Sequence, residues 1–171
     1  MEIATVMPSD AGDRRPSVDC SDDMIPLLSA SRLTGTPSAM AAATLSHDGD
    51  SDNSWPWVGI EILRTYANDG ARRAMTDLRT FIGRCPTVAS SAPGAATYRF
   101  ALAPGPELGD DSLRVSCSST SGADTLSFDS MLVRTGTALI VVEEQGNNPD
   151  DDKLLAQVAE AALHRYQTTG S

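Results

Sequence analysis

The sequence predicts an α+β domain: one mostly antiparallel sheet of about five strands, with helices packed on one face and an open cleft on the other. Two stretches with helical spacing of apolar residues, 68–85 and 152–167, enclose a run of strand-like segments. Four of these segments follow one another over 96–144 and are separated by turn-rich connections. Segregated strands and helices of this kind are typical of the α+β class.

Length and charge limit both the organisation of the chain and its partners. The 171 residues are 40% hydrophobic, enough for one domain with a core, which we expect over 20–167 after a flexible arm at 1–19. A net charge of −10 argues against nucleic acid as a partner, because phosphate binding needs a face rich in Lys and Arg. No apolar run approaches the roughly 18 residues of a transmembrane helix, so we expect no membrane insertion.

The N-terminal part of the domain is the least regular. Ser21 can cap a short helix within 20–33, and 39–46 is read as a strand, with a second helical piece as the alternative. Residues 47–56 have the composition of a loop. The segment 57–67 alternates and predicts a strand with one buried face formed by Val58, Ile60 and Ile62.

The first long helix is predicted over 68–85, with Asn68 or Asp69 as its cap. Its apolar stripe comprises Ala71, Met75, Leu78, Ile82 and Cys85. Pro86 cannot continue the helix and restricts the residue before it, so the helix ends at Cys85. Cys85 therefore lies on the buried side of the last turn, where it can meet a thiol from another element.

The remaining elements are strands at 96–103, 113–117, 125–134 and 137–144, and a helix at 152–167. The strand at 137–144 is apolar on both sides from Ala138 to Val142, which is typical of a central strand. The terminal helix is strongly periodic. Its predicted inward residues are Leu155, Val158, Ala159, Ala162 and Tyr166.

Neither a metal site nor a cofactor is predicted. The three cysteines form no CxxC pair and have no ligand-like spacing to either histidine, and their odd number allows at most one bridge. The loop at 47–52, HDGDSD, alternates carboxylates but lacks the terminal Glu of a calcium loop. No GxSxG elbow or histidine-based triad is evident.

Several stretches of the chain resemble the extracellular sensor domain of PknH-type serine/threonine kinases and the related sensor-domain lipoproteins of actinobacteria. The stretches are CSDDMIPLL (20–28), ANDGARRAMTDLRTFIGRCP (67–86), PELGDDSLRV (106–115), MLVRTGTALIVVEEQG (131–146) and DKLLAQVAEAALHRY (152–166). The resemblance implies that Cys85 pairs with Cys20 and leaves Cys117 alone. It also implies a cleft for an unknown small ligand, on the sheet face away from the helices.

The ligand-binding residues are predicted on that open face. Alternation places Trp57, Glu61, Leu63 and Thr65 together, and Arg99, Asp129, Arg134 and Glu143 are expected opposite them. An aromatic wall with two arginines and carboxylates suits a partly polar small molecule. The alternative is a solvated face with cross-strand ion pairs, and a register slip of one residue would invert every assignment.

Three functions are compatible with these residues. The first is a non-enzymatic, sensor-like module that binds a small ligand. The second is a cytoplasmic tailoring enzyme, such as a cyclase or isomerase, in which Glu61, Asp110 or Glu143 moves a proton. Asp110 and Asp111 are an alternative acid/base pair, although an Asp-Asp after Gly often only caps a turn. The third is a protein-interaction domain whose acidic loops bind a basic partner.

The cellular location follows from which function applies. The N-terminus lacks a basic start, an apolar core and a cleavage site, so it does not predict a secretory signal. We expect an extracytoplasmic protein if the chain is an excised ectodomain, and a cytoplasmic one if the chain is complete as written.

Overall fold

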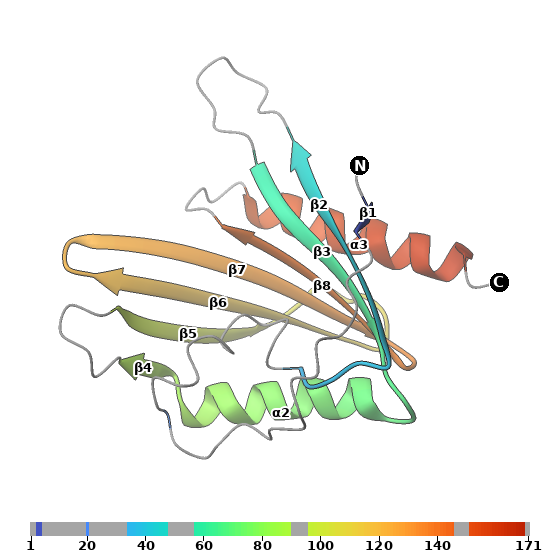
Figure 1. The fold of residues 1–171 in the computed structure, drawn as a ribbon, viewed down its shortest axis with the longest axis horizontal. Helices are drawn as coiled ribbons and strands as arrows, with labels where there is room; N and C mark the ends of the chain where they lie inside the picture. Colours follow the sequence, from blue (N-terminus) through green and yellow to red (C-terminus); the bar gives the residue numbers. More distant parts are fainter. Residues whose placement is uncertain are drawn as a thin grey trace.

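A computed structural model describes residues 3–4, 20, 34–47, 57–89, 96–145 and 151–169 (Figure 1). In this part of the chain, all strands form one antiparallel sheet in the order β1-β2-β3-β8-β7-β6-β5-β4. The strands are β1 (Ile3–Ala4), β2 (Ala39–His47), β3 (Trp57–Thr65), β4 (Thr87–Ala89), β5 (Thr97–Pro104), β6 (Asp111–Ser121), β7 (Asp124–Thr135) and β8 (Ala138–Gln145), and the helices are α2 (Gly70–Arg84) and α3 (Asp151–Thr169).

The predicted α+β class is confirmed, but the predicted number of about five strands is too low. β1 and β4 are two and three residues long, too short for alternation to reveal them. The strand reading of 39–46 is confirmed by β2. The predicted helix within 20–33 and most of the loop at 47–56 lie outside the described residues.

The four predicted consecutive strands pair in chain order, as β5 with β6, β6 with β7 and β7 with β8. Gly122 and Gly136 occupy the two tight turns with φ of +60° and +56°, a conformation that glycine adopts without a steric penalty. β8 lies between β3 and β7, so the prediction of a central strand is confirmed.

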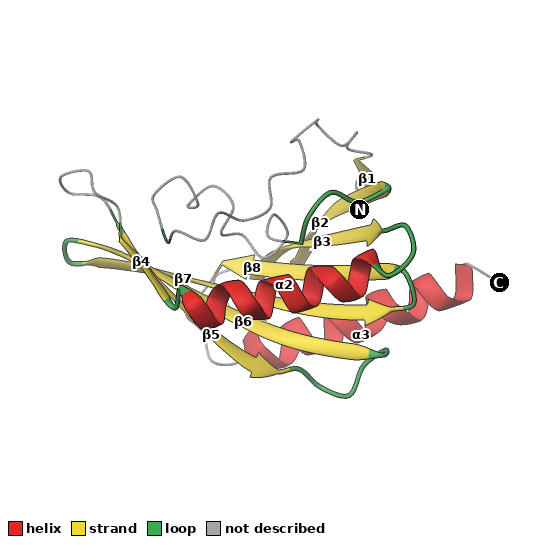
Figure 2. Ribbon diagram, turned by 90° about the horizontal axis from the view of Figure 1, so that it is seen from below, coloured by secondary structure: helices red, strands yellow, loops and turns green. Residues whose placement is uncertain are grey.

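The two helices cover opposite faces of the sheet, so the prediction of helices on one face and an open second face is wrong. α2 packs on the side of Ile62, Leu132, Leu139 and Val141, called here the α2 face. α3 packs on the side of Met131, Val133, Ile140 and Val142, the α3 face. Figure 2 shows α2 in front of the strands and α3 behind them. The apolar residues on both sides of β8 require this second cover.

The sequence of α2 explains both its packing and its end. Its buried residues recur at helical spacing: Ala71, Ala74, Met75, Leu78, Phe81 and Ile82. Asp69 occupies the N-cap position without a side-chain cap bond and instead forms ion pairs with Arg72 and Arg73. At the other end the N–H of Cys85 donates to the carbonyl of Phe81 at 2.8 Å, and Pro86 ends the helix.

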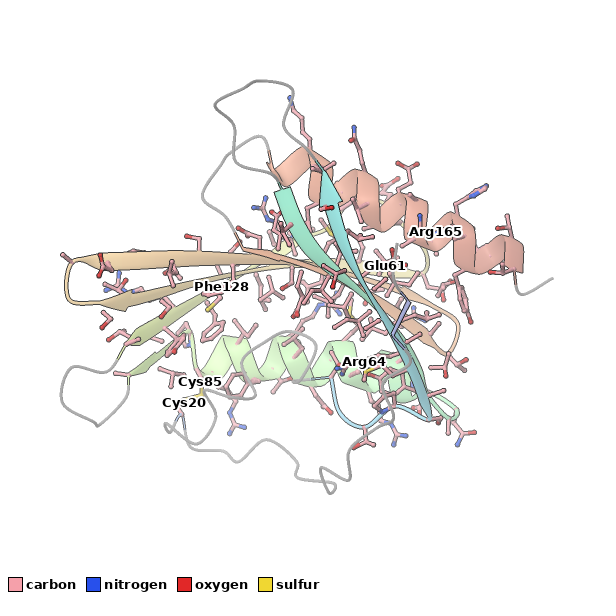
Figure 3. The ribbon with its side chains drawn as sticks, turned by 45° about the horizontal axis from the view of Figure 1, so that its top comes forward. Cys20, Glu61, Arg64, Cys85, Phe128 and Arg165 are labelled. Carbon is pink, nitrogen blue, oxygen red and sulfur yellow. A yellow bond between two sulfur atoms is a disulfide. The ribbon has the colours of Figure 1, made fainter. Side chains whose placement is uncertain are left out.

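A disulfide joins Cys20 to Cys85, as the family resemblance implied (Figure 3). The two Cα atoms lie 5.6 Å apart, within the usual range for a disulfide. Cys85 is buried at the end of α2, and Cys20 is exposed. The bridge therefore attaches Cys20 to the C-terminal end of α2. Cys117 on β6 is a free cysteine.

Candidate functional site

The predicted ligand-binding residues are divided between the two faces of the sheet. Antiparallel partners share a face, so the register assigns each residue by its partner. Glu61 pairs with Val142 and Thr65 with Ala138, which places both on the α3 face. Asp129 also lies on the α3 face, as does Arg99 two strands away. Trp57 is the first residue of β3, but its side chain lies outside the described residues.

Arg134 and Glu143 lie on the α2 face, which corrects the prediction that they join the others. Arg134 pairs with Leu139 and Glu143 pairs with Ile60, both of which belong to that side. The reason is parity, because Arg134 is five residues from Asp129 and an odd separation along a strand changes the face. These two side chains therefore cannot act on the same ligand surface as Glu61, Arg99 and Asp129.

Glu61 has a structural partner on α3. Its carboxylate accepts a hydrogen bond and ion pair from Nη2 of Arg165, and Figure 3 shows the two side chains close together across the α3 face. Glu61 is 19% exposed and Arg165 is 51% exposed, so the pair lies at the edge of the helix–sheet contact. α3 therefore occupies the position that was predicted to be open above β3.

α3 makes its main contacts with β7 and β8 and also reaches β3 through the Glu61–Arg165 pair, so part of the α3 face, on β5 and β6, lies beyond these main contacts. Arg99, Ala101 and Ala103 on β5 are exposed there. We call this surface the polar half-sheet. It comprises Arg99, Ala101 and Ala103 on β5, Arg114, Ser116 and Ser118 on β6, and Asp129 on β7.

The carboxylate of Asp129 is held in place by several hydrogen bonds within the polar half-sheet. Its Oδ1 accepts hydrogen bonds from Nε and Nη2 of Arg114 at 3.3 and 3.1 Å, and from Oγ of Ser116 at 2.5 Å. Among the described residues, Oδ2 accepts no hydrogen bond. Asp129 is only 17% exposed, so a fixed and largely desolvated carboxylate retains one unused oxygen.

One row of the sheet brings a second carboxylate beside Asp129. Gly59, Glu144, Asp129, Ser116 and Ala101 follow one another across β3, β8, β7, β6 and β5. Glu144 is an acidic residue near the end of a strand, and it is buried. The row therefore joins two carboxylates that are flanked on both sides by small residues.

Arg114, Ser116 and Glu144 were absent from the predicted site, although a signal for the first two exists in the sequence. In the segment 113–117 the apolar Leu113 and Val115 alternate with Arg114 and Ser116. Because Leu113 and Val115 are buried on the α2 face, their neighbours must lie on the α3 face. For Glu144 the sequence gives no comparable signal.

Asp110 and Asp111 act as structural ties and have separate partners. Oδ2 of Asp110 accepts bonds from Nη1 of Arg134 at 3.0 Å and from the N–H of Gly136 at 2.7 Å. Asp111 accepts two bonds from Arg79 of α2, at 2.9 and 2.7 Å. These bonds from Arg79 lower the pKa of Asp111 below its ordinary value. The turn-capping alternative thus describes Asp110 well, and Asp111 attaches α2 to β6.

The free thiol of Cys117 is poorly placed for chemistry at neutral pH. It lies on the α2 face opposite Phe128, and burial, with a smaller contribution from the charge of Asp129, raises its pKa to about 11. A thiol rather than a thiolate is therefore the form present near pH 7.

In the described residues, no group of three or more His, Cys, Asp and Glu side chains is placed to hold a metal ion. Neither of the helices α2 and α3 is long and apolar enough to cross a membrane. No family model, curated protein or solved structure matches the chain.

Proposed function

We propose that this domain is a non-enzymatic, sensor-like module that binds a small polar ligand on the polar half-sheet. The observation that carries the proposal is the Asp129 carboxylate. It is largely buried, its Oδ1 is held by Arg114 and Ser116, and its Oδ2 has no hydrogen-bond partner among the described residues. A fixed acceptor of this kind binds a ligand donor without first having to be ordered.

The surroundings of Asp129 suit a ligand that lies flat on the strands. Ala101 and Ser116 share its row and are short, so that a ligand can approach the backbone of the sheet closely. Arg99 is exposed and forms no ion pair with a described residue, so its guanidinium can bind an acceptor or an anionic group. We infer a ligand that carries a hydroxyl or amino group for Asp129 and an acceptor for Arg99.

The resemblance to PknH-type sensor domains and the disulfide support the same reading. Disulfides persist in oxidising compartments, so the Cys20–Cys85 bridge favours an extracytoplasmic location for this domain. The resemblance adds the expectation of an unidentified small ligand.

The alternative of a tailoring enzyme has less support. Glu61 is paired with Arg165 on the α3 face, Asp110 is bound to Arg134 beside a turn, and Glu143 lies on the α2 face. Glu61 and Glu143 therefore lie on opposite faces of the sheet, and the carboxylate of Asp110 is already bound by Arg134 and Gly136. Catalysis at any of them therefore stays a prediction.

The test is a ligand screen followed by mapping of the binding surface. A library of small hydroxyl- and amino-bearing compounds is screened by thermal shift, and each hit is mapped from backbone amide NMR shifts. We expect the shifts to concentrate on β5, β6 and β7, and Asp129→Asn to weaken binding about tenfold or more, as for the loss of a hydrogen bond to a charged group.

The matched control is Asp124→Asn at the exposed start of β7, which should leave the affinity unchanged. Hits whose shifts map elsewhere, or whose affinity is insensitive to Asp129→Asn, would exclude this surface. The mapping uses the wild-type protein, so the proposal can fail even if the Asp129 variant folds poorly.

A further inference from the structure

Arg64 is the most buried arginine of the described residues, and it lies on the α2 face. Its cross-strand neighbours are Met40 of β2 and Leu139 of β8, both of which pack in the apolar cluster under α2. Only 7% of its surface is exposed. A guanidinium is charged at any physiological pH, so a full positive charge lies in largely apolar surroundings.

The polar contacts of Arg64 fix its position but do not neutralise it. Nη1 donates to Oγ1 of Thr34 at 2.5 Å, and Thr34 is itself 1% exposed. The hydroxyl of Tyr66 donates to the carbonyl of Thr34 at 2.9 Å, which holds this segment against the sheet. Within the described chain, Thr34 is the hydrogen-bond partner of the guanidinium, and no carboxylate is paired with it.

The unused edge of the guanidinium is the one formed by Nε and Nη2. Nε is buried without a hydrogen-bond partner. Nη2 also has no partner among the described residues, and it is not fully enclosed. Two parallel N–H groups on one edge of a guanidinium match the two oxygens of a carboxylate.

The other partly buried arginines show how unusual this arrangement is in the described part of the chain. Arg79, Arg114 and Arg134 are less buried than Arg64, and each is paired with an aspartate. The chain as a whole has 23 acidic and 13 basic residues, so acidic partners are abundant. A buried charge without a counter-charge is strongly unfavourable, and the cost is removed when an anion binds.

We propose that the Nε–Nη2 edge of Arg64 binds the carboxylate of a small organic acid. The site is independent of the polar half-sheet, because Arg64 and Asp129 lie on opposite faces of the sheet. Thr34 holds the opposite side of the guanidinium, so that the free edge is already oriented for two parallel hydrogen bonds.

The test uses acetate as the probe and the side-chain Nε–H resonance of Arg64 as the reporter. Sodium acetate is titrated into the ¹⁵N-labelled protein at constant ionic strength, with sodium chloride as the exchanged salt. We expect a saturable shift of the Arg64 signal, together with a rise in Tm of about 4 °C at ten times the dissociation constant. The absence of a saturable shift up to 100 mM acetate, a limit on the order of a weak single-group affinity, would overturn the proposal.

Two variants and a second anion sharpen the result. Arg64→Lys keeps the charge but lacks the paired N–H groups, and Arg64→Met removes the charge; both should lose the Tm rise. Arg84→Lys, at an exposed arginine of α2, should keep it. A rise that persists in both Arg64 variants would overturn the site. Inorganic phosphate should bind more weakly than acetate, and a shift with phosphate alone would overturn the carboxylate class.

Discussion

The two faces of the sheet are covered by helices that are attached in different ways. Both helices bury an apolar stripe, which includes Leu78 in α2 and Leu155 in α3. α2 also carries a disulfide at its C-terminal end and a bidentate ion pair from Arg79 to the sheet. The ion pair of α3 joins Arg165, which is half exposed, to Glu61. α2 is thus held by directional ties, whereas α3 depends more on apolar packing.

This difference separates the structural and functional uses of the two faces. On the α2 face Arg79 and Arg134 each have a carboxylate partner, whereas Arg64 has none among the described residues. On the α3 face the helix contacts β7 and β8 and leaves the polar side chains of β5 and β6 uncovered. Removing one attachment at a time, by substitution of a cysteine, a buried leucine or an ion-pair residue, tests this contrast.

The largest effect is expected from the disulfide. Cys20→Ala removes an exposed side chain, so its main effect is the loss of the bridge. Closing a loop of 65 residues stabilises the folded state by about 4 kcal/mol in the chain-entropy treatment, and the variant should lose about that much free energy of unfolding. Urea denaturation of the two proteins measures the difference.

Cys117→Ala is the matched control, because it removes a cysteine without removing a bridge. We expect it to cost about 1 kcal/mol or less, the usual range for a partly buried substitution. Thiol counting by alkylation should give one reactive cysteine in the unfolded wild-type protein without reductant. Three reactive thiols, or equal losses in the two variants, would show that the bridge does not stabilise the α2 layer.

The next largest effect on stability is expected from the apolar stripes of the two helices. Leu78→Ala and Leu155→Ala each remove a fully buried leucine, one from each helix. Each should lower the free energy of unfolding by about 3 kcal/mol, because transfer and cavity terms add. The same denaturation experiment measures both values. A loss below about 1 kcal/mol for Leu155→Ala alone would mean that α3 does not cover this face of the sheet.

The pattern of β8 contained more information than the sequence-based prediction used. Both sides of this strand are apolar, which correctly predicted a central position. The same pattern also requires a cover for Ile140 and Val142, and only the periodic helix at the C-terminus was available to provide it. The predicted open second face was therefore inconsistent with the apolar residues on both sides of β8.

The alternation of side chains along each strand likewise determines which of the predicted site residues share a face. Arg134 and Glu143 could have been assigned to the α2 face from their odd separations from Asp129 and Val142. Two other features were beyond local sequence reasoning. The extent to which α3 covers the sheet depends on the path of the whole chain, and the burial of Arg64 depends on the segment at Thr34.

The smallest effects on stability are expected from the two helix–sheet ion pairs, Arg79–Asp111 and Arg165–Glu61. The contribution of the first pair depends on pH. Asp111→Asn should lower the free energy of unfolding at pH 7 by about 1 kcal/mol, a value discounted for the partial exposure of Asp111 and Arg79. The folded-state pKa of Asp111 is depressed, so its stabilisation is complete above the unfolded pKa of about 4. It is lost as the pH falls below 4 towards the folded pKa. Denaturation of both proteins from about pH 2 to about pH 7, a range that includes the unfolded pKa of about 4, measures this loss.

Glu61→Gln on the α3 face supplies the comparison. Arg165 is half exposed, so solvent screens this pair, and the variant should cost about 0.5 kcal/mol or less. The charge of Asp77 is also exposed, and Asp77→Asn should change stability even less, which corrects for general charge effects on α2. If Glu61→Gln instead cost more than Asp111→Asn, α3 would be the helix held by its ion pair, and the contrast between the two faces would reverse.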